Sequence, residues 1–204
     1  KKVVNDLNLN VRVVKKRAFG YAIPLYKNSP VRIYMTPEEA SKLEEPIKLE
    51  LAFTKAGKLS VKAEYVQDGE DQEMVQAFDQ LPAVLPTPVG VLSFTRGDTS
   101  CMEEEEIALR ATINTPIETA EEYMKDLSVS ASSQTTTIAK ISVKNTVKER
   151  GVDFVNRLVA FYNQDANDEK NEVAQKTAEF IEERIGIINH GLGAAESELA
   201  DFKQ

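Results

Sequence analysis

Side chains that commonly carry catalysis or hold metals are few in this sequence. His190 is the only histidine and Cys101 the only cysteine among 204 residues, and neither stands at a spacing typical of zinc sites or catalytic triads. Ser132 and Ser133 lack the context of a nucleophile elbow. No glycine-rich loop leads into a Lys-Ser or Lys-Thr pair, as a phosphate-binding loop would. The sequence therefore predicts no enzyme active site, cofactor or metal centre in this segment.

Two weaker patterns could serve binding. Arg96-Gly97-Asp98 is a tripeptide that some integrins recognise, but Gly-Asp after a strand is ordinary turn chemistry, which is the favoured interpretation. Four tyrosines could stack on sugar rings, although the chain lacks the Trp that sugar platforms favour: Tyr21, Tyr26, Tyr34 and Tyr65. A carbohydrate-binding module built on the β-rich block is therefore one alternative function.

The clearest pattern is an apolar stripe near the end of the chain. Its residues recur at steps of three and four, which places them on one face of an α-helix. The helix should begin near residue 147, with an apolar root over 151–162 and a polar middle over 163–172. We expect the stripe to be an oligomer or partner interface, with these members: Ile181, Ile185, Ile188, Leu192, Leu199 and Phe202.

Three glycines interrupt the outer helix, namely Gly186, Gly191 and Gly193. Because Gly costs about 1 kcal/mol in a helix interior, the sequence predicts a kink or break over residues 188–193. The alternative to an intermolecular stripe is a helix that folds back there and covers its own domain.

Composition narrows the class of partner. The formal net charge is −8, which argues against nucleic acid as a main partner. The apolar fraction of 42% is enough for a folded core, and the sequence contains no signal peptide or membrane span. The chain begins without Met and ends within a helical pattern, so we expect it to be a piece of a longer protein.

The order of elements predicts an α+β fold. Strands are expected over residues 7–14, 107–113, 127–131 and 137–143, and helices over 116–125 and 147–162. From residue 107 onward the order is β-α-β-β-α. With the strand over 7–14 added in front, it matches a ferredoxin-like split βαβ, with all four strands in one sheet and a long protruding C-terminal helix.

Three parts are expected along the chain. Residues 1–30 and 100–162 should form a discontinuous α/β base domain. Residues 31–99, rich in alternating strands and turns, should form an inserted antiparallel β-sandwich or barrel, with 81–88 as an extended loop because of its three prolines. Residues 163–204 should be an extended helix, truncated before its partner.

Three stretches carry a resemblance to a known family. They read VVNDLNLNV (3–11), TPIETAEEYMKDLSVSASSQTTTIAKISVKNTVKERGVDFVNRLVAFY (115–162) and AQKTAEFIEERIGIINHGLGAAESELADFK (174–203). In their order and spacing they resemble the extracytoplasmic domain of polysaccharide co-polymerases of the Wzz and Wzc/GumC type.

The resemblance implies a non-catalytic periplasmic scaffold, held between two inner-membrane helices of its parent, that forms a homo-oligomeric ring. Its implied partners are other copies of itself, a polysaccharide polymerase or outer-membrane export protein, and the nascent polysaccharide. The implied role is control of chain length or export of capsular polysaccharide, exopolysaccharide or O-antigen. A parent of the Wzc type would carry a cytoplasmic tyrosine autokinase. The alternative scaffold function is a periplasmic adaptor of an efflux or secretion system.

Overall fold

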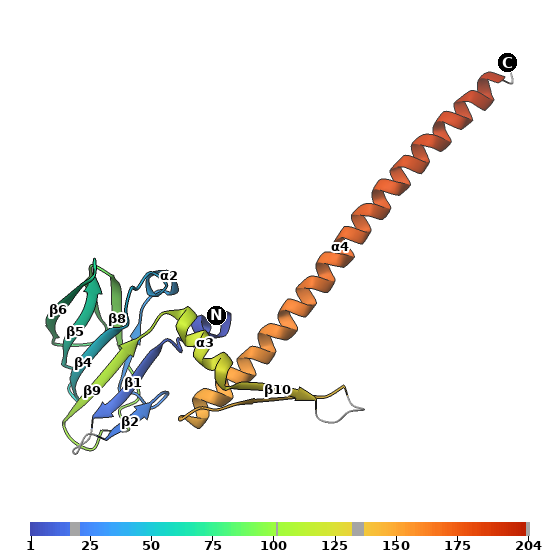
Figure 1. The fold of residues 1–204 in the computed structure, drawn as a ribbon. Helices are drawn as coiled ribbons and strands as arrows, with labels where there is room; N and C mark the ends of the chain where they lie inside the picture. Colours follow the sequence, from blue (N-terminus) through green and yellow to red (C-terminus); the bar gives the residue numbers. More distant parts are fainter. Residues whose placement is uncertain (17–20, 101, 132–136, 203–204) are drawn as a thin grey trace. The chain divides into compact units, whose positions relative to one another are not determined.

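The computed structural model describes the chain over residues 1–16, 21–100, 102–131 and 137–202, and it combines antiparallel sheets with a long C-terminal helix (Figure 1). The chain divides into two compact units, Lys1–Leu158 and Val159–Gln204. The first unit contains all the sheets, and the second is built from the outer part of the last helix.

The larger sheet of the first unit has six strands in the order β2-β1-β9-β4-β5-β6, and all its neighbours are antiparallel. Apolar and polar side chains alternate along its central strands, so that one face is buried. The strands are β1 (Val11–Lys16), β2 (Ala22–Leu25), β4 (Ile47–Thr54), β5 (Leu59–Gln67), β6 (Glu70–Phe78) and β9 (Glu106–Ile113).

A three-stranded sheet in the order β3-β8-β7 shares its core with the larger sheet. Phe53 of the larger sheet and Phe94 of the smaller one are fully buried members of this common cluster. The strands are β3 (Val31–Tyr34), β7 (Ala83–Thr87) and β8 (Gly90–Arg96), with the short helix α2 (Pro37–Ala40) after β3. The β-rich block of residues 31–99 thus contributes to a sandwich, but β4, β5 and β6 join β1 and β9 in one sheet.

Helices α1 (Lys2–Asp6) and α3 (Pro116–Asp126) pack against each other beside the larger sheet. The start of α3 was predicted from sequence and is confirmed, with Thr115 as N-cap and Pro116 in the first turn. Thr115 Oγ1 accepts the Glu118 N–H at 3.2 Å and donates to the Glu118 carboxylate at 2.9 Å. Thr36 caps α2 in the same manner.

Strands β10 (Leu127–Ala131) and β11 (Ala139–Val143) form a separate antiparallel hairpin. Its register places Leu127 opposite Val143 and Val129 opposite Ile141, so one face is apolar, while Ser128 and Ser130 lie on the other. Val129 is 62% exposed. A two-stranded sheet without further cover is only marginally stable in water, so its apolar face and open edges require explanation.

The predicted single sheet of four strands is wrong in this structure. Strands β1 and β9 are neighbours, but β1 is flanked by β2 and β9, and β9 by β1 and β4. Strand β1 is paired on both sides over residues 13–15 and β9 over 109–113, and among the described residues the hairpin pairs only with itself.

Two strand boundaries also differ from expectation. Helix α1 precedes a first strand that begins only at Val11, because Asn8 takes a positive φ of 51° and turns the chain within the alternating LNLN segment. The expected loop over 81–88 contains strand β7. Pro86 is tolerated there because β7 is an edge strand.

Helix α4 (Lys148–Phe202) is a single α-helix of 55 residues. The predicted break over 188–193 is therefore wrong, and so is a chain that folds back at Gly191 and Gly193. Glycine weakens a helix but keeps its N–H donor, so without a proline the hydrogen-bond ladder can continue through all three glycines. The root of the helix, up to Leu158, belongs to the first unit.

Phe154 joins the root of α4 to α3. Its side chain is 6% exposed and its ring stacks on Tyr123, with centroids 4.3 Å apart. Phe154→Ala should therefore lower the free energy of unfolding by about 3–5 kcal/mol, measured by urea denaturation. Val152→Ala, which truncates a side chain that is 49% exposed two residues away, is the control and should cost clearly less. Equal losses would show that Phe154 is not core.

Candidate interaction surface on the long helix and the network at its root

The predicted interface residues lie on the outer part of α4. Ile181, Ile185 and Ile188 are 50%, 52% and 65% exposed, so each presents much of its side chain to solvent. Leu192, Leu199 and Phe202 lie in the same helix, but their side chains are outside the described part of the structure. Among the described side chains from Val159 to Gly193 only Phe161 and Ala166 are half-buried, and the others are exposed.

The apolar surface is broader than the sequence stripe. Phe180 and Ile187 are 60% and 57% exposed, and they follow Val173 at steps of seven residues, which sequence analysis did not use. At 100° per residue the sector from Ile187 through Val173 to Ile185 spans about 160° of the helix circumference. A seam for one coiled-coil partner is narrower than this. We refer to these six side chains as the outer apolar face: Val173, Phe180, Ile181, Ile185, Ile187 and Ile188.

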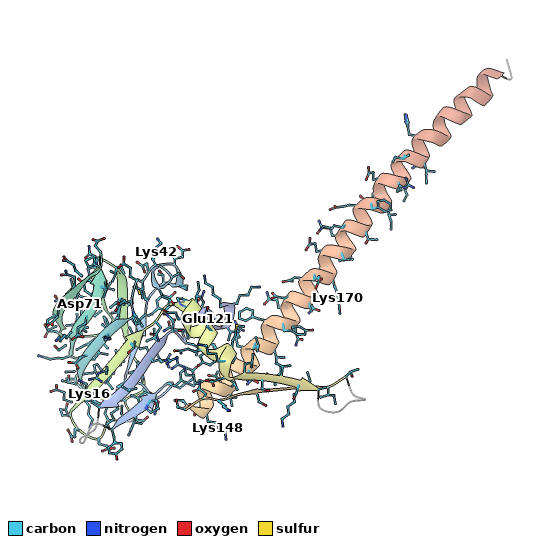
Figure 2. The ribbon with its side chains drawn as sticks, in the orientation of Figure 1. Lys16, Lys42, Asp71, Glu121, Lys148 and Lys170 are labelled. Carbon is cyan, nitrogen blue, oxygen red and sulfur yellow. The ribbon has the colours of Figure 1, made fainter. Side chains whose placement is uncertain are left out.

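Local interactions stabilise this helix along its polar side. Lys176 pairs with Glu172 one turn earlier at 2.6 Å, and Gln175 donates to Glu179 at 3.2 Å. The Arg184 guanidinium lies 5.8 Å from the Phe180 ring centroid. Lys170 marks the polar middle segment (Figure 2). Such pairs stabilise a helix by only a few tenths of a kcal/mol each, so they do not replace packing of the outer apolar face.

The root of α4 is held by a buried arginine. Arg150 is 7% exposed, and its Nε donates to the Tyr123 hydroxyl at 3.0 Å. Its Nη2 donates to the carbonyls of Leu9 and Val11, the latter at 3.2 Å. Strand β2 pairs only with Val13 to Lys16 of β1, so Arg150 supplies donors to the start of β1 that β2 does not reach. One guanidinium thus joins α4, α3 and β1.

Helix α4 approaches the hairpin closely at Gly151. A Cβ placed on Gly151 would lie 3.3 Å from the Asn145 Cβ and 3.4 Å from the Val143 Cγ1. Asn145 donates to the Tyr123 hydroxyl at 3.2 Å and also accepts the Val147 N–H at 2.9 Å, just before the helix. The turn between β11 and α4 is therefore fixed against the same tyrosine that Arg150 contacts.

A second set of contacts surrounds Tyr26. Arg150 Cζ lies 5.8 Å from the Tyr26 ring centroid, and Lys27 pairs with Asp153 at 2.6 Å. Burial, and then the hydrogen bond to Asp153, raise the pKa of Tyr26 to about 12. The pKa of Asp153 is lowered, chiefly by its bond to Lys27. Further along, Arg157 makes two bonds of 2.6 Å to the Asp6 carboxylate of α1.

A cleft of about 700 Å³ adjoins this network. It is lined by cations, carboxylates and apolar side chains, including Arg12, Glu122, Lys144 and Arg150, and Arg12 is ion-paired with Glu122. Its lining also includes the hydroxyl of Thr146, the hydroxyl of Tyr123, which accepts from Arg150, and the carboxylate of Asp126. Two of these residues join elements, since Arg12 links β1 to α3 and Arg150 links α4 to both.

The weaker sequence candidates have structural roles. In Arg96-Gly97-Asp98 the main-chain N–H groups of Gly97 and Asp98 donate to Pro30 and Ser29, and a Cβ on Gly97 would lie 2.1 Å from the Ser29 oxygen. This tripeptide is therefore a packed turn. Tyr65 is buried in the core, Tyr26 belongs to the α4 network, and only Tyr21 and Tyr34 are well exposed, at 75% and 48%.

In the described part of the chain, the His, Cys, Asp and Glu side chains nowhere form a group of three or more that could hold a metal ion. Within the same residues, no helix combines the length and the apolarity needed to cross a membrane. Compared with known proteins, the chain matches no protein-family model and no curated protein.

Arg150→Met keeps much of the side-chain volume but removes the donors to Leu9, Val11 and Tyr123. Because two carbonyls of the sheet would lose a buried charged donor, the free energy of unfolding should fall by about 2–4 kcal/mol in urea denaturation. Arg184→Met, on the exposed outer helix, is the matched control and should change stability by less than about 0.5 kcal/mol. A loss below about 1 kcal/mol for Arg150→Met would contradict the joining role.

The raised pKa of Tyr26 predicts that the stability of the folded chain falls at high pH. Since the folded phenol holds its proton to about pH 12 while the unfolded phenol loses it near pH 10, its stabilising contribution is present below pH 10 and lost between pH 10 and 12. The stability advantage of the native chain over Tyr26→Phe should therefore shrink across that window. Titration of tyrosinate absorbance should show that the variant lacks one late-ionising phenol. Loss of an early-ionising phenol instead would refute the assignment.

Proposed function

We propose that this chain is a non-catalytic scaffold domain of a polysaccharide co-polymerase of the Wzz and Wzc/GumC type. In this proposal it lies in the periplasm, its parent is anchored in the inner membrane, and copies assemble into a ring. The ring controls chain length or export of a surface polysaccharide by positioning a polymerase or an outer-membrane export protein. Any tyrosine kinase activity belongs to another part of the parent.

One observation carries the proposal, namely the outer apolar face of α4. Six apolar side chains, each at least half exposed, lie on a helix of 55 residues whose outer part makes up a unit by itself. Leaving so much apolar surface in water is costly, and contiguous exposed patches of this kind usually mark interaction sites. A scaffold that assembles through helices accounts for this face, whereas a carbohydrate-binding module does not need it.

The breadth of the face supports more than one neighbour. A sector of about 160° can contact two helices at once, one on the Ile187 side and one on the Ile185 side. In the proposed parent these would be a second helical segment of the same copy and a neighbouring copy. An adaptor whose helix meets a single partner would need only a narrow seam.

The order of the elements along the chain supports the family proposal more strongly than the pairing of the strands supports it. Elements β9, α3, β10, β11 and α4 follow one another in the β-α-β-β-α order that the resemblance implies. The proposal keeps the ferredoxin-like order of elements along the chain. It does not keep the single sheet, because the hairpin and the larger sheet are separate here.

The test changes the outer apolar face in the parent protein. The triple variant Ile181→Asp, Ile185→Asp and Ile188→Asp should abolish control of polysaccharide chain length, read from the length distribution on gels. The melting temperature of the isolated chain should hardly change, because these three side chains are exposed.

The matched control adds three carboxylates to the polar side of the same helix, through Asn171→Asp, Gln175→Asp and Asn189→Asp. It should preserve chain-length control, because these positions lie outside the apolar sector. An unchanged length distribution for the apolar triple variant would refute the proposal. A fall in melting temperature as large as that of Phe154→Ala would mean that the face is core.

A further inference from the structure

We propose that two copies of this chain pair through strand edges of opposite charge, with β6 of one copy beside β11 of the next. The inference concerns a contact distinct from the outer apolar face. It deepens the proposed scaffold role, and its biological meaning rests on that role. The physical claim itself can be tested on the purified chain.

Strand β6 is a long and acidic free edge. It spans nine residues, ends the larger sheet opposite β2, and contains no proline (Figure 1). Residues 68–79 hold five carboxylates and no cation, and Asp71 is labelled on this edge in Figure 2. Outside its ladder with β5, the only described hydrogen bond to a β6 main-chain group is local, from Gln76 Nε2 to the Ala77 oxygen at 3.3 Å.

Strand β11 is an open edge of the opposite sign. Residues 137–148 hold three lysines and no carboxylate, namely Lys140, Lys144 and Lys148, and all three are exposed. Apart from the ladder with β10, no hydrogen bond among the described residues uses a main-chain group of Ala139–Val143. A third strand would turn this marginal hairpin into a sheet of ordinary stability.

The other free edges of the two larger sheets are poor templates. Strands β2 and β3 have only four residues each, and β2 contains Pro24. Strand β7 contains Pro86 and lies between Pro82 and Pro88. Short edges and edge prolines are standard protection against pairing. Strand β6 is neither short nor interrupted by a proline.

Charges on an edge usually protect it from pairing, and here they also select the partner. A β6–β6 contact would place carboxylates beside carboxylates, and a β11–β11 contact would place lysines beside lysines. Like charges directly opposite each other are destabilising. Pairing of β6 with β11 is the combination that brings opposite charges together.

An antiparallel register satisfies both faces of the joined sheet. With Met74 opposite Ile141, two apolar side chains meet on the face that continues the core of the larger sheet. On the other face Asp71 lies opposite Lys144, and Glu73 lies diagonally between Lys140 and Lys144. Glu73 already pairs with Lys62 at 3.0 Å, but an exposed pair of this kind contributes little and can be shared.

This contact uses two different surfaces, so it is heterologous. Each copy offers one β6 and one β11, and repetition of the contact gives a closed ring if the rotation closes and a filament if it does not. A contact of this type can therefore build the proposed ring without a two-fold dimer.

The test reverses charge on one edge at a time in the full chain. The basic-edge variant carries Lys140→Glu and Lys144→Glu, and the acidic-edge variant carries Asp71→Lys and Glu73→Lys. Sedimentation velocity up to about 1 mM should show weak association of the native chain and at least about tenfold weaker association of each variant. An equal mixture of the two variants should regain native association, because each reversed edge then meets an edge of opposite charge.

The acidic-edge variant separates this contact from general charge effects. It raises the formal net charge by four from −8, so simple relief of repulsion predicts stronger association, whereas the edge pairing predicts weaker association. Lys42→Glu with Lys170→Glu is the matched control for the basic-edge variant and should retain native association. Melting temperatures of all variants should stay close to native, since the four substituted side chains are exposed.

Cysteine cross-linking checks the register independently. In a Cys101→Ser background, Met74→Cys with Ile141→Cys should form ladders of disulfide-linked copies on oxidation, and either cysteine alone should not form ladders. The proposal is overturned by a native chain that stays monomeric at about 1 mM, by an acidic-edge variant that associates more strongly, or by a mixture that fails to recover. Asp substitutions on the outer apolar face should leave this association unchanged, so the two proposals fail separately.

Discussion

The buried guanidinium of Arg150 is the contact on which the arrangement of the first unit depends. A charge this deeply buried is tolerated only when donors and acceptors match, and here its Nε and Nη2 groups reach a hydroxyl and two carbonyls. These acceptors lie in α3 and in the segment that leads into β1, so the root of α4 cannot move without leaving carbonyls unpaired. The stacked pair of Tyr123 and Phe154 adds apolar packing at the same place. The outer helix therefore begins from a fixed root.

A fixed root of α4 is what the proposed scaffold role requires. The network of Arg150, Tyr26 and Asp153 pairs polar groups with one another at the root of α4. The surfaces left unsatisfied are of another kind, an apolar helix face and two charged strand edges. In the proposed scaffold, protein partners would complete both kinds of surface.

Local signals in the sequence predicted local structure well. The helix start at Pro116 is confirmed, and the bounds of β10 are as expected, because each depends on neighbours in the chain. The continuity of α4 through its glycines was not predicted, because a propensity of about 1 kcal/mol per glycine is a weak guide in a long helix.

The pairing partners of the strands and the buried polar contacts could not be predicted from local sequence signals. Alternation identifies a strand but not the neighbour it pairs with, so the inserted strands were not expected to share a sheet with β1 and β9. The role of Arg150 depends on carbonyls about 140 residues away in sequence, and nothing in the local pattern marks it. The seven-residue steps from Val173 to Ile187 were present in the sequence, but only the exposed fractions of these side chains in the structure show how broad the outer apolar face is.

Amide hydrogen exchange, compared between the isolated chain and the assembled parent protein, would test assembly through the outer part of α4. We expect rapid exchange there in the isolated chain and strong protection after assembly, with little change in Lys1–Leu158 outside the strand edges. Equal protection of the outer helix in both states would contradict a scaffold that assembles through this helix.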